Sequence, residues 1–366
     1  MELSLHHQTR LTENKAISAI KLSISSRNVN LTQHRPLKTV IRRFLSDAAY
    51  HRAATLWHSR KHYAWFTQTG LTRGWPERIL FFGGGPGDDL LCTVVLRELR
   101  KRGQKKTWMM SKQPELFENN SDVDQIVPID YRFRDYAWIL GKKWHLLEYA
   151  RIDVEKDKSE SPKRHILAEL CGRLEIKGEI MMRPYFHLKE EERAKASWAR
   201  DMVAIQSSGL GGQMAMRNKQ WFPERFQDVV NSLKGNLKFV QLGSASDPAL
   251  DDVVDLRGKT DIRETAAILA NCRLNLGNVG FLMHLARAVE CPSVIIFGGR
   301  EAPWQSGYSC NINLYSGVPC APCWLWNKCD YNRICMNQIT ANNVINAIEQ
   351  TTSRMRNPLA VDEFKI

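Results

Sequence analysis

The sequence predicts an α/β protein with two Rossmann-like domains that face each other across a cleft, preceded by a basic N-terminal extension. Three observations support this fold class. Short apolar runs alternate with helical segments, as in parallel sheets. The alternation occurs twice, and the length of 366 residues suits two or three domains. The expected divisions are the extension, an N-terminal domain, a C-terminal domain and a tail, at residues 1–77, 78–195, 196–350 and 351–366.

The basic extension carries most of the net charge of +13. Residues 1–76 contain 12 Lys or Arg against three acidic residues, so this segment alone carries +9. Such an arm can contact anionic lipid, nucleic acid or an acidic partner by Coulomb attraction. The equally weighted alternative is a solvated extension with no partner.

The composition is that of an ordinary globular protein, with 43% hydrophobic and 25% charged residues. No apolar run approaches the ~18 to 20 residues that cross a bilayer, and the first residues lack the apolar region of a secretory signal. We therefore expect the protein to be cytoplasmic.

The first alternating series begins where the extension ends. An apolar run closed by glycines predicts a strand and a turn over residues 78–85, and helical spacing predicts a helix over 88–102. The stretch 142–164 is highly charged and is expected to be an exposed excursion. A strand, a short helical piece and another strand are expected between these segments, at residues 106–112, 115–119 and 123–129.

The second series begins near Trp198. Pro223 opens one expected helix, and Asp261 caps another, with Glu264 completing a capping box. In chain order, the expected elements are a strand, a helix, a strand, a helix, a strand, a helix and a strand, at residues 202–206, 223–233, 237–242, 261–270, 273–276, 281–290 and 293–297. Ligands of such sheets bind at the carboxyl ends of the strands, so the loops there are the places to search for a site.

The glycine-rich loop after the first strand ends in Gly85-Pro-Gly87-Asp88-Asp89. It lacks the Lys-Ser/Thr of a P-loop and the third glycine of a dinucleotide fingerprint, so it does not indicate nucleotide binding. Its glycines allow close approach of the backbone, and Asp88 can abstract a proton from a hydroxyl nucleophile. The alternative is that Asp88 only caps its helix.

Loops in the second half favour binding of phosphate groups. Lys219 precedes a helix, and glycines lie between a strand and the helix that contains His284. A hydrogen-bonded structural histidine is the commoner explanation for His284, as a packed aromatic is for Trp221. The candidate donor-binding residues in these loops are Ser207, Ser208, Gly209, Gly243, Ser244, Gly277, Asn278, Gly280 and His284.

Taken together and in order, five motifs resemble glycosyltransferase family 9, the heptosyltransferase family of lipopolysaccharide assembly. The resemblance covers about residues 78–350. The motifs are Gly87-Asp88 with its helix, Ser207-Ser-Gly with Lys219-x-Trp, Gln241-Leu-Gly-Ser, Leu256-x-Gly-Lys-Thr and Leu282-Met-His-Leu-Ala.

The resemblance implies a GT-B fold and an inverting, metal-independent transfer that requires no cofactor. Asp88 matches the family's general base, on an acceptor-side loop with Gly85 and Gly87, and Lys219 matches the lysine that neutralises the donor diphosphate. The implied partners are a nucleotide-diphosphate sugar, with ADP-heptose as the leading donor, and a glycolipid or glycan acceptor. Peripheral contact with the inner membrane would suit the basic arm; no nucleic-acid partner is expected.

One departure from the family pattern affects the donor side. Where the family commonly has Asp-Thr/Ser-Gly before the histidine, this chain has Val279-Gly280-Phe281. The donor carboxylate is therefore absent, unless Asn278 substitutes for it as a hydrogen-bonding group. The alternative hypothesis is a non-catalytic protein that binds a nucleotide sugar or a glycan.

Four cysteines cluster near the C-terminus, at Cys320, Cys323, Cys329 and Cys335. Four thiols within 16 positions can hold a structural zinc or iron ion, and the alternative is buried thiols that brace a loop. The spacing matches no familiar zinc finger and the basic arm has few aromatics, so a nucleic-acid-binding module is the least favoured hypothesis. The other five cysteines are expected to be buried free thiols.

Overall fold

The computed structural model describes residues 63–354, except 105, 131–132, 135–136, 138–140 and 213–214, together with 363–365. The chain divides into two units, Met1–Thr72 and Arg73–Ile366. In the first unit, the described residues 63–72 are helical. The rest of the predicted basic extension, including most of its charge, lies outside the described residues.

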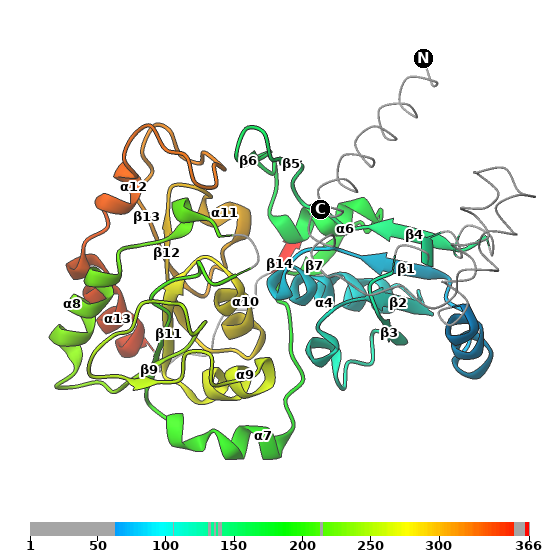
Figure 1. The fold of residues 1–366 in the computed structure, drawn as a ribbon, viewed down its shortest axis with the longest axis horizontal. Helices are drawn as coiled ribbons and strands as arrows, with labels where there is room; N and C mark the ends of the chain where they lie inside the picture. The colour runs from blue at the N-terminus through cyan, green and yellow to red at the C-terminus, as the bar shows by residue number, and fades with distance from the viewer. Residues whose placement is uncertain are drawn as a thin grey trace, which may run out of the picture. The chain divides into compact units, whose positions relative to one another are not determined.

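The first half of the second unit contains a four-stranded parallel sheet, in the order β3-β2-β1-β4 (Figure 1). Its strands are β1 (Arg78–Phe81), β2 (Thr107–Met110), β3 (Gln125–Val127) and β4 (Lys143–Leu146). The helix α4 (Pro86–Lys101) follows β1 and buries Leu90 and Val94 in the same apolar cluster as Leu80. The predicted strand, glycine turn and helix are therefore confirmed.

The charged stretch 142–164 is not simply an excursion, and that prediction was wrong for its first part. Residues Lys143–Leu146 form β4, which pairs in parallel with β1 at the edge of the sheet. An edge strand can carry exposed, charged side chains, so the charge of this stretch did not reveal the strand. The rest includes a hairpin formed by β5 (Ile152–Asp153) and β6 (Lys158–Ser159).

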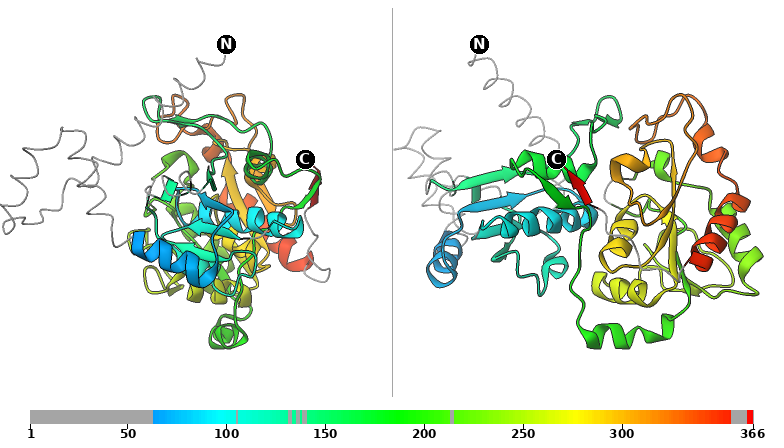
Figure 2. Two further views of the ribbon diagram at one scale, coloured as in Figure 1. Left: turned by 90° about the vertical axis from the view of Figure 1, so that its right-hand side faces the viewer. Right: turned by 180° about the vertical axis from the view of Figure 1, so that it is seen from behind.

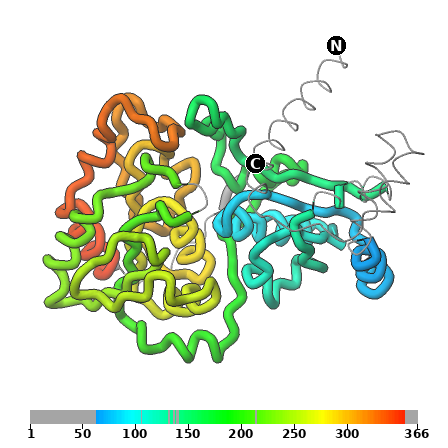
Figure 3. Tube along the Cα trace, viewed as in Figure 1, coloured from blue at the N-terminus to red at the C-terminus, as the bar shows by residue number. Residues whose placement is uncertain are grey.

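The remaining elements of this half are the 3₁₀ helix η1 (Pro114–Phe117), α6 (Ile166–Arg173) and β7 (Glu179–Met181). The chain then continues through α7 (Glu190–Lys195) and η2 (Ser197–Ala199) to the second sheet, as the tube in Figure 3 traces. Near the other end of the chain, β14 (Glu363–Lys365) pairs antiparallel with β7. Part of the predicted C-terminal tail is therefore a strand.

The second half contains a six-stranded parallel sheet, in the order β10-β9-β8-β11-β12-β13. Strands β8 and β12 are wholly buried, which explains their continuous apolar sequence. The strands are β8 (Val203–Ile205), β9 (Phe239–Gln241), β10 (Val254–Asp255), β11 (Leu274–Asn278), β12 (Ser293–Gly298) and β13 (Ile312–Tyr315).

Helices cover this sheet as the sequence predicts. Asp261 Oδ1 accepts a hydrogen bond from Glu264 N at 2.7 Å, and Glu264 Oε2 accepts one from Asp261 N at 3.0 Å, which confirms the capping box of α9 (Ile262–Asn271). The helix α8 (Pro223–Leu233) packs beside α13 (Ala341–Arg354), as Figure 2 also shows. The other helices are α10 (Phe281–Ala288), α11 (Pro303–Ser306), α12 (Ile334–Asn337) and the 3₁₀ helix η3 (Arg217–Lys219).

Two helices from different halves of the chain, α4 and α10, pack against each other. Their side chains share one buried apolar cluster, which includes Leu91 of α4 and Met283 of α10. A Cβ atom added at Gly87 would lie 3.5 Å from the Cα of Phe281, so the start of α4 closely approaches the start of α10. This packing brings the two sets of sequence motifs together.

Among the described residues, no helix has both the length and the apolarity needed to cross a membrane.

Candidate active site

The candidate site is built from loops that follow parallel strands. Asp88 follows β1, Tyr149 follows β4, Lys219 follows β8, and Glu301 follows β12. Loops at the carboxyl ends of parallel strands are where α/β sheets bind their ligands. The sequence predicted two of these four residues, Asp88 and Lys219.

Asp88 makes two hydrogen bonds in the first turn of α4. Its Oδ2 accepts from the backbone N–H of Gly85 at 3.0 Å, and its Oδ1 accepts from the Tyr149 hydroxyl at 3.1 Å. The first bond confirms the helix-capping role that was considered for this residue. Burial raises the pKa of Asp88, against the lowering effects of the Gly85 and Tyr149 hydrogen bonds and of the Lys219 charge.

The glycine before this cap leaves room for the carboxylate. A Cβ atom added at Gly84 would lie 2.0 Å from Asp88 Oδ2 and 2.7 Å from its Cγ, so the carboxylate would have to move. A Cβ atom added at Gly85 would meet nothing within 4 Å, and its φ of −85° suits any residue.

Gly84→Ala is therefore expected to lower any activity that depends on Asp88 by about tenfold or more, since a small misplacement of a reacting group is costly. Gly85→Ala should lose much less of this activity than Gly84→Ala. Turnover of both variants, measured beside their melting temperatures, checks this prediction. Equal turnover of the two variants at equal stability would contradict it.

Lys219 lies at the end of η3, with a fifth of its side chain exposed. Its Nζ is 2.7 Å from Glu301 Oε1. Burial lowers the pKa of Lys219, while the Glu301 carboxylate acts to raise it. The charge of Lys219 acts to lower the pKa of Asp88, so the two residues predicted from separate motifs lie in one cluster.

The sequence analysis missed Glu301, which is 3% exposed. Arg300 Nη1 lies 2.9 Å from its Oε1, and Ser306 Oγ donates to its Oε2 at 2.6 Å. Burial opposes ionisation of Glu301, but Lys219 and Arg300 outweigh it and lower the pKa to about 2. The available signal was the position of Arg300-Glu301 directly after a strand, where ligands of parallel sheets bind.

His284 has the structural role that was favoured for it from the sequence. It is 6% exposed on α10, and its Nδ1 lies 2.7 Å from the Tyr308 hydroxyl oxygen. Burial, and secondly the charge of Lys219, lower the pKa of His284 to about 3, so this ring is neutral at physiological pH. A Cβ atom added at Gly87 of α4 would lie 3.8 Å from His284 Cδ2, so the start of α4 lies beside this ring.

The predicted serines use their hydroxyls inside the protein. Ser207 Oγ donates to Pro248 O at 2.6 Å, and Ser208 Oγ accepts from Leu210 N at 3.1 Å. Gln220 Oε1 accepts from the backbone N–H of Gly209 at 2.6 Å. These residues shape the loop after β8.

Ser244 is held in the loop after β9. Its backbone N–H donates to Asp247 at 3.0 Å, beside Gly243 at a φ of +125° that favours glycine.

Asn278 ends β11 and is 4% exposed. Its Oδ1 accepts from Trp221 N at 3.0 Å, and its Nδ2 donates to Gln220 at 3.5 Å. The amide therefore holds the backbone of Trp221, and its role as a substitute for the missing donor carboxylate stays a prediction. Trp221 is 1% exposed, as expected of a packed aromatic.

The first turn of α10 is the part of this region that best suits an anion. Its N-cap is Gly280, which provides no side-chain hydrogen bond to the helix. Gly277, the last residue but one of β11, has no side chain. A helix N-terminus that lacks a capping side chain offers backbone N–H groups to a phosphate.

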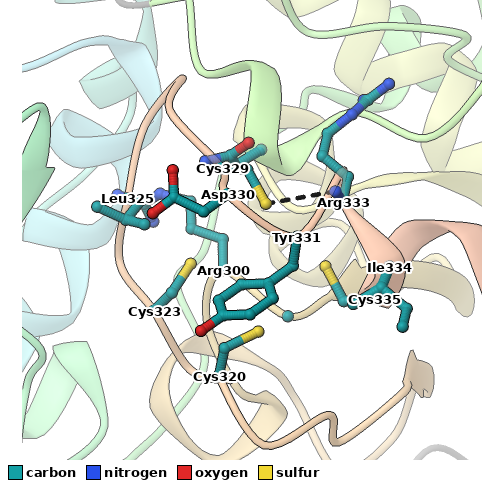
Figure 4. A pocket seen from close by; sticks show the side chains of 12 residues that line it. Arg300, Cys320, Cys323, Leu325, Cys329, Asp330, Tyr331, Arg333, Ile334 and Cys335 are labelled. Atoms are coloured by element: carbon teal, nitrogen blue, oxygen red, sulfur yellow. Dashed lines mark hydrogen bonds between the residues drawn. The ribbon is translucent and has the colours of Figure 1, made fainter.

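The four clustered cysteines line one cavity of about 50 Å³ in the second half of the unit (Figure 4). They are free thiols, and Cys329 Sγ accepts a hydrogen bond from Arg333 N at 3.3 Å. Within the described part of the chain, no three His, Cys, Asp or Glu side chains are arranged to hold a metal ion. The thiols therefore share a cavity but, as placed, do not form a metal site. Cys92, Cys171, Cys272 and Cys291 are buried, as expected, whereas Cys310 is only partly buried.

A known protein family matches part of the chain. Residues 174–325 match the model of glycosyltransferase family 9 (heptosyltransferase). This confirms the family resemblance. The matched region includes Lys219, Glu301 and His284, whereas Asp88 lies before it. No curated protein sequence matches the chain.

Solved structures of a heptosyltransferase and of a glycosyltransferase share the fold. The Escherichia coli ADP-heptose lps heptosyltransferase II is 14% identical, with a TM-score of 0.56 over 76% of this chain and 99% of that chain. The iron-containing dodecameric glycosyltransferase TibC from enterotoxigenic E. coli H10407 is 16% identical, with a TM-score of 0.59 over 76% of each chain. TibC in complex with ADP-D-beta-D-heptose is similar at 14% identity, with a TM-score of 0.57 over 76% of this chain and 77% of that chain. The predicted GT-B fold class is confirmed.

Proposed function

We propose that the protein is a cytoplasmic, inverting glycosyltransferase that moves a sugar from a nucleotide-diphosphate donor to a lipopolysaccharide or other surface-glycan acceptor. One observation carries the proposal. Asp88 and Lys219 belong to motifs about 130 residues apart, yet they lie close enough for the charge of Lys219 to lower the pKa of Asp88. A base and a cation in one site are the two groups that such a transfer needs.

In the proposed reaction, Asp88 accepts the proton of an acceptor hydroxyl. The acceptor oxygen then forms a bond to the anomeric carbon, and the bond from that carbon to the diphosphate oxygen breaks. The electron pair leaves with the nucleoside diphosphate. Lys219 and the N-terminus of α10 stabilise the negative charge that develops there.

Heptose on ADP is the proposed donor. The support comes from the family match and from the two similar proteins, one an ADP-heptose heptosyltransferase and the other crystallised with ADP-D-beta-D-heptose. The acceptor and peripheral contact with the inner membrane remain proposals based on the family resemblance and on the charge of residues 1–76.

A thermal-shift screen of the purified protein tests the proposal. A ligand that binds only the folded state raises the melting temperature, so ADP, UDP, GDP, CMP and their sugar conjugates can be ranked directly. Selective stabilisation by ADP and ADP-heptose is expected. If no nucleotide or nucleotide sugar binds, the protein is not a transferase of this kind, and the missing carboxylate before Gly280 would explain the loss.

Metal ions are proposed to have no part in the transfer, because a lysine and a helix N-terminus supply the charge at the diphosphate. A structural iron or zinc ion at the four cysteines is a separate proposal. It is supported by the cavity that the thiols share, although their present placement does not assemble a site.

Elemental analysis of the purified protein, before and after Cys323→Ser, tests the structural metal. We expect stoichiometric iron or zinc in the wild-type protein and its loss in Cys323→Ser. A metal-free wild-type protein would contradict that proposal. Chelation should leave transfer intact while the protein stays folded, and loss of transfer on chelation without unfolding would contradict the metal-independent mechanism.

A further inference from the structure

We infer that Glu301 is a positioning residue for Lys219: it holds the lysine ammonium in the site and releases it to the donor diphosphate. This inference rests on the proposed function. Glu301 belongs to the loop after β12, whereas Lys219 belongs to η3, so their ion pair fixes one loop against another.

The arrangement allows Glu301 to give up one partner without becoming an unpaired buried charge. Its Oε1 is shared by Lys219 at 2.7 Å and Arg300 at 2.9 Å, and Ser306 occupies Oε2. If Lys219 turns to a diphosphate, Arg300 and Ser306 still satisfy the carboxylate. An unpaired buried charge would otherwise be strongly destabilising.

The two cations differ in their freedom to move. Arg300 is 2% exposed, and its guanidinium carbon lies 4.6 Å from the centre of the Trp324 ring. The Lys219 side chain is 20% exposed and bonds through a single ammonium group on a flexible stem. Arg300 is therefore the fixed partner of Glu301, and Lys219 is the exchangeable one.

The same carboxylate affects the ionisation of both proposed reaction groups. Glu301 raises the pKa of Lys219 against the effect of burial, and it adds to the effect of burial in raising the pKa of Asp88. Removing its charge should lower both pKa values. The other ionisable groups that interact with Glu301 are Arg300, Tyr149, His165 and His284.

The test compares the wild-type protein with Glu301→Gln, which keeps the shape of the side chain and removes its charge. The probe is ADP or, if another binds better, GDP or UDP, and the measurement is Kd across neutral and alkaline pH. Affinity should fall when Lys219 loses its proton. In Glu301→Gln this alkaline loss should occur at lower pH, with about ten- to a hundredfold weaker binding than wild type in that range.

Two further variants separate positioning from a merely structural role. Glu98→Gln is the matched control, since Glu98 of α4 is also a buried, ion-paired carboxylate, with its Oε2 2.6 Å from Arg102 Nη1. It should leave the pH dependence of binding unchanged. Glu301→Asp retains the charge and should restore much of the wild-type profile.

Each outcome decides one claim. Suppose that wild type binds a nucleoside diphosphate and that Glu301→Gln loses affinity at the same alkaline pH as wild type. The inference about Glu301 is then wrong, and the proposed function stands. If the folded wild-type protein binds none of the three diphosphates, the proposed function fails, and the inference fails with it.

Discussion

Replacement of Asp88 by asparagine is expected to lower sugar transfer by about 10²- to 10⁴-fold, the usual contribution of a general base. Asparagine keeps the size of the side chain and one hydrogen-bonding oxygen, so the backbone N–H of Gly85 can still donate a hydrogen bond to it. It has no carboxylate to accept the acceptor proton. Donor binding and the melting temperature should stay close to wild type, because the donor diphosphate contacts Lys219 and α10 in the proposed mechanism.

Asp89→Asn is the matched control for this prediction. Asp89 is the next residue of α4 and is also buried, but its carboxylate bonds to Ser111 Oγ at 2.5 Å. Burial raises the pKa of Asp89 to about 7. Judged by its pKa alone, Asp89 would also be a candidate for the proton acceptor. We expect transfer by Asp89→Asn to exceed that of Asp88→Asn by at least about tenfold. The reverse order would assign the base to Asp89.

Replacement of Lys219 by methionine is expected to weaken binding of the donor and of its nucleoside diphosphate by about ten- to a hundredfold, the loss of one hydrogen bond to a charged group. Transfer should fall further, because the leaving diphosphate gains charge as the bond to the sugar breaks. Methionine keeps an unbranched stem, and Glu301 retains Arg300 and Ser306 as partners. The protein should therefore stay folded.

Arg217→Met provides the control for charge and location, since Arg217 is an exposed cation in the same short helix. Calorimetric titration of ADP into both variants checks the prediction. Equal affinities for Lys219→Met and wild type would remove Lys219 from the diphosphate site. An equal loss in both variants would show that net charge alone attracts the ligand.

Much of the fold could be predicted from local pattern. The α8 range follows from its apolar spacing and from Pro223 in its first turn, and the start of α9 follows from the Asp261 capping box. The strand β4 could not be recognised, because an edge strand needs no continuous apolar run. The pairing of β14 with β7 joins segments about 180 residues apart, and no local signal predicts it.

The sequence predicted those candidate-site residues that lie in the motifs of the family resemblance. Asp88 and Lys219 follow from their motifs, but Glu301 depends on the approach of η3 to the loop after β12, which only the folded chain shows. The hydrogen bond made by Asn278 could not be predicted from the sequence either, because its partner lies far away along the chain. In the sequence it lies beside the missing donor carboxylate, whereas in the structure it holds the backbone of Trp221.

In the proposed reaction, Asp88 and Lys219 act in one glycosyl-transfer site with separate roles. Calorimetric titration of ADP-heptose into wild type, Asp88→Asn and Lys219→Met distinguishes these roles. We expect wild type and Asp88→Asn to bind with similar affinity, and Lys219→Met to bind about ten- to a hundredfold more weakly. If wild type binds no nucleotide sugar, or if all three proteins bind equally well, this assignment of roles is wrong.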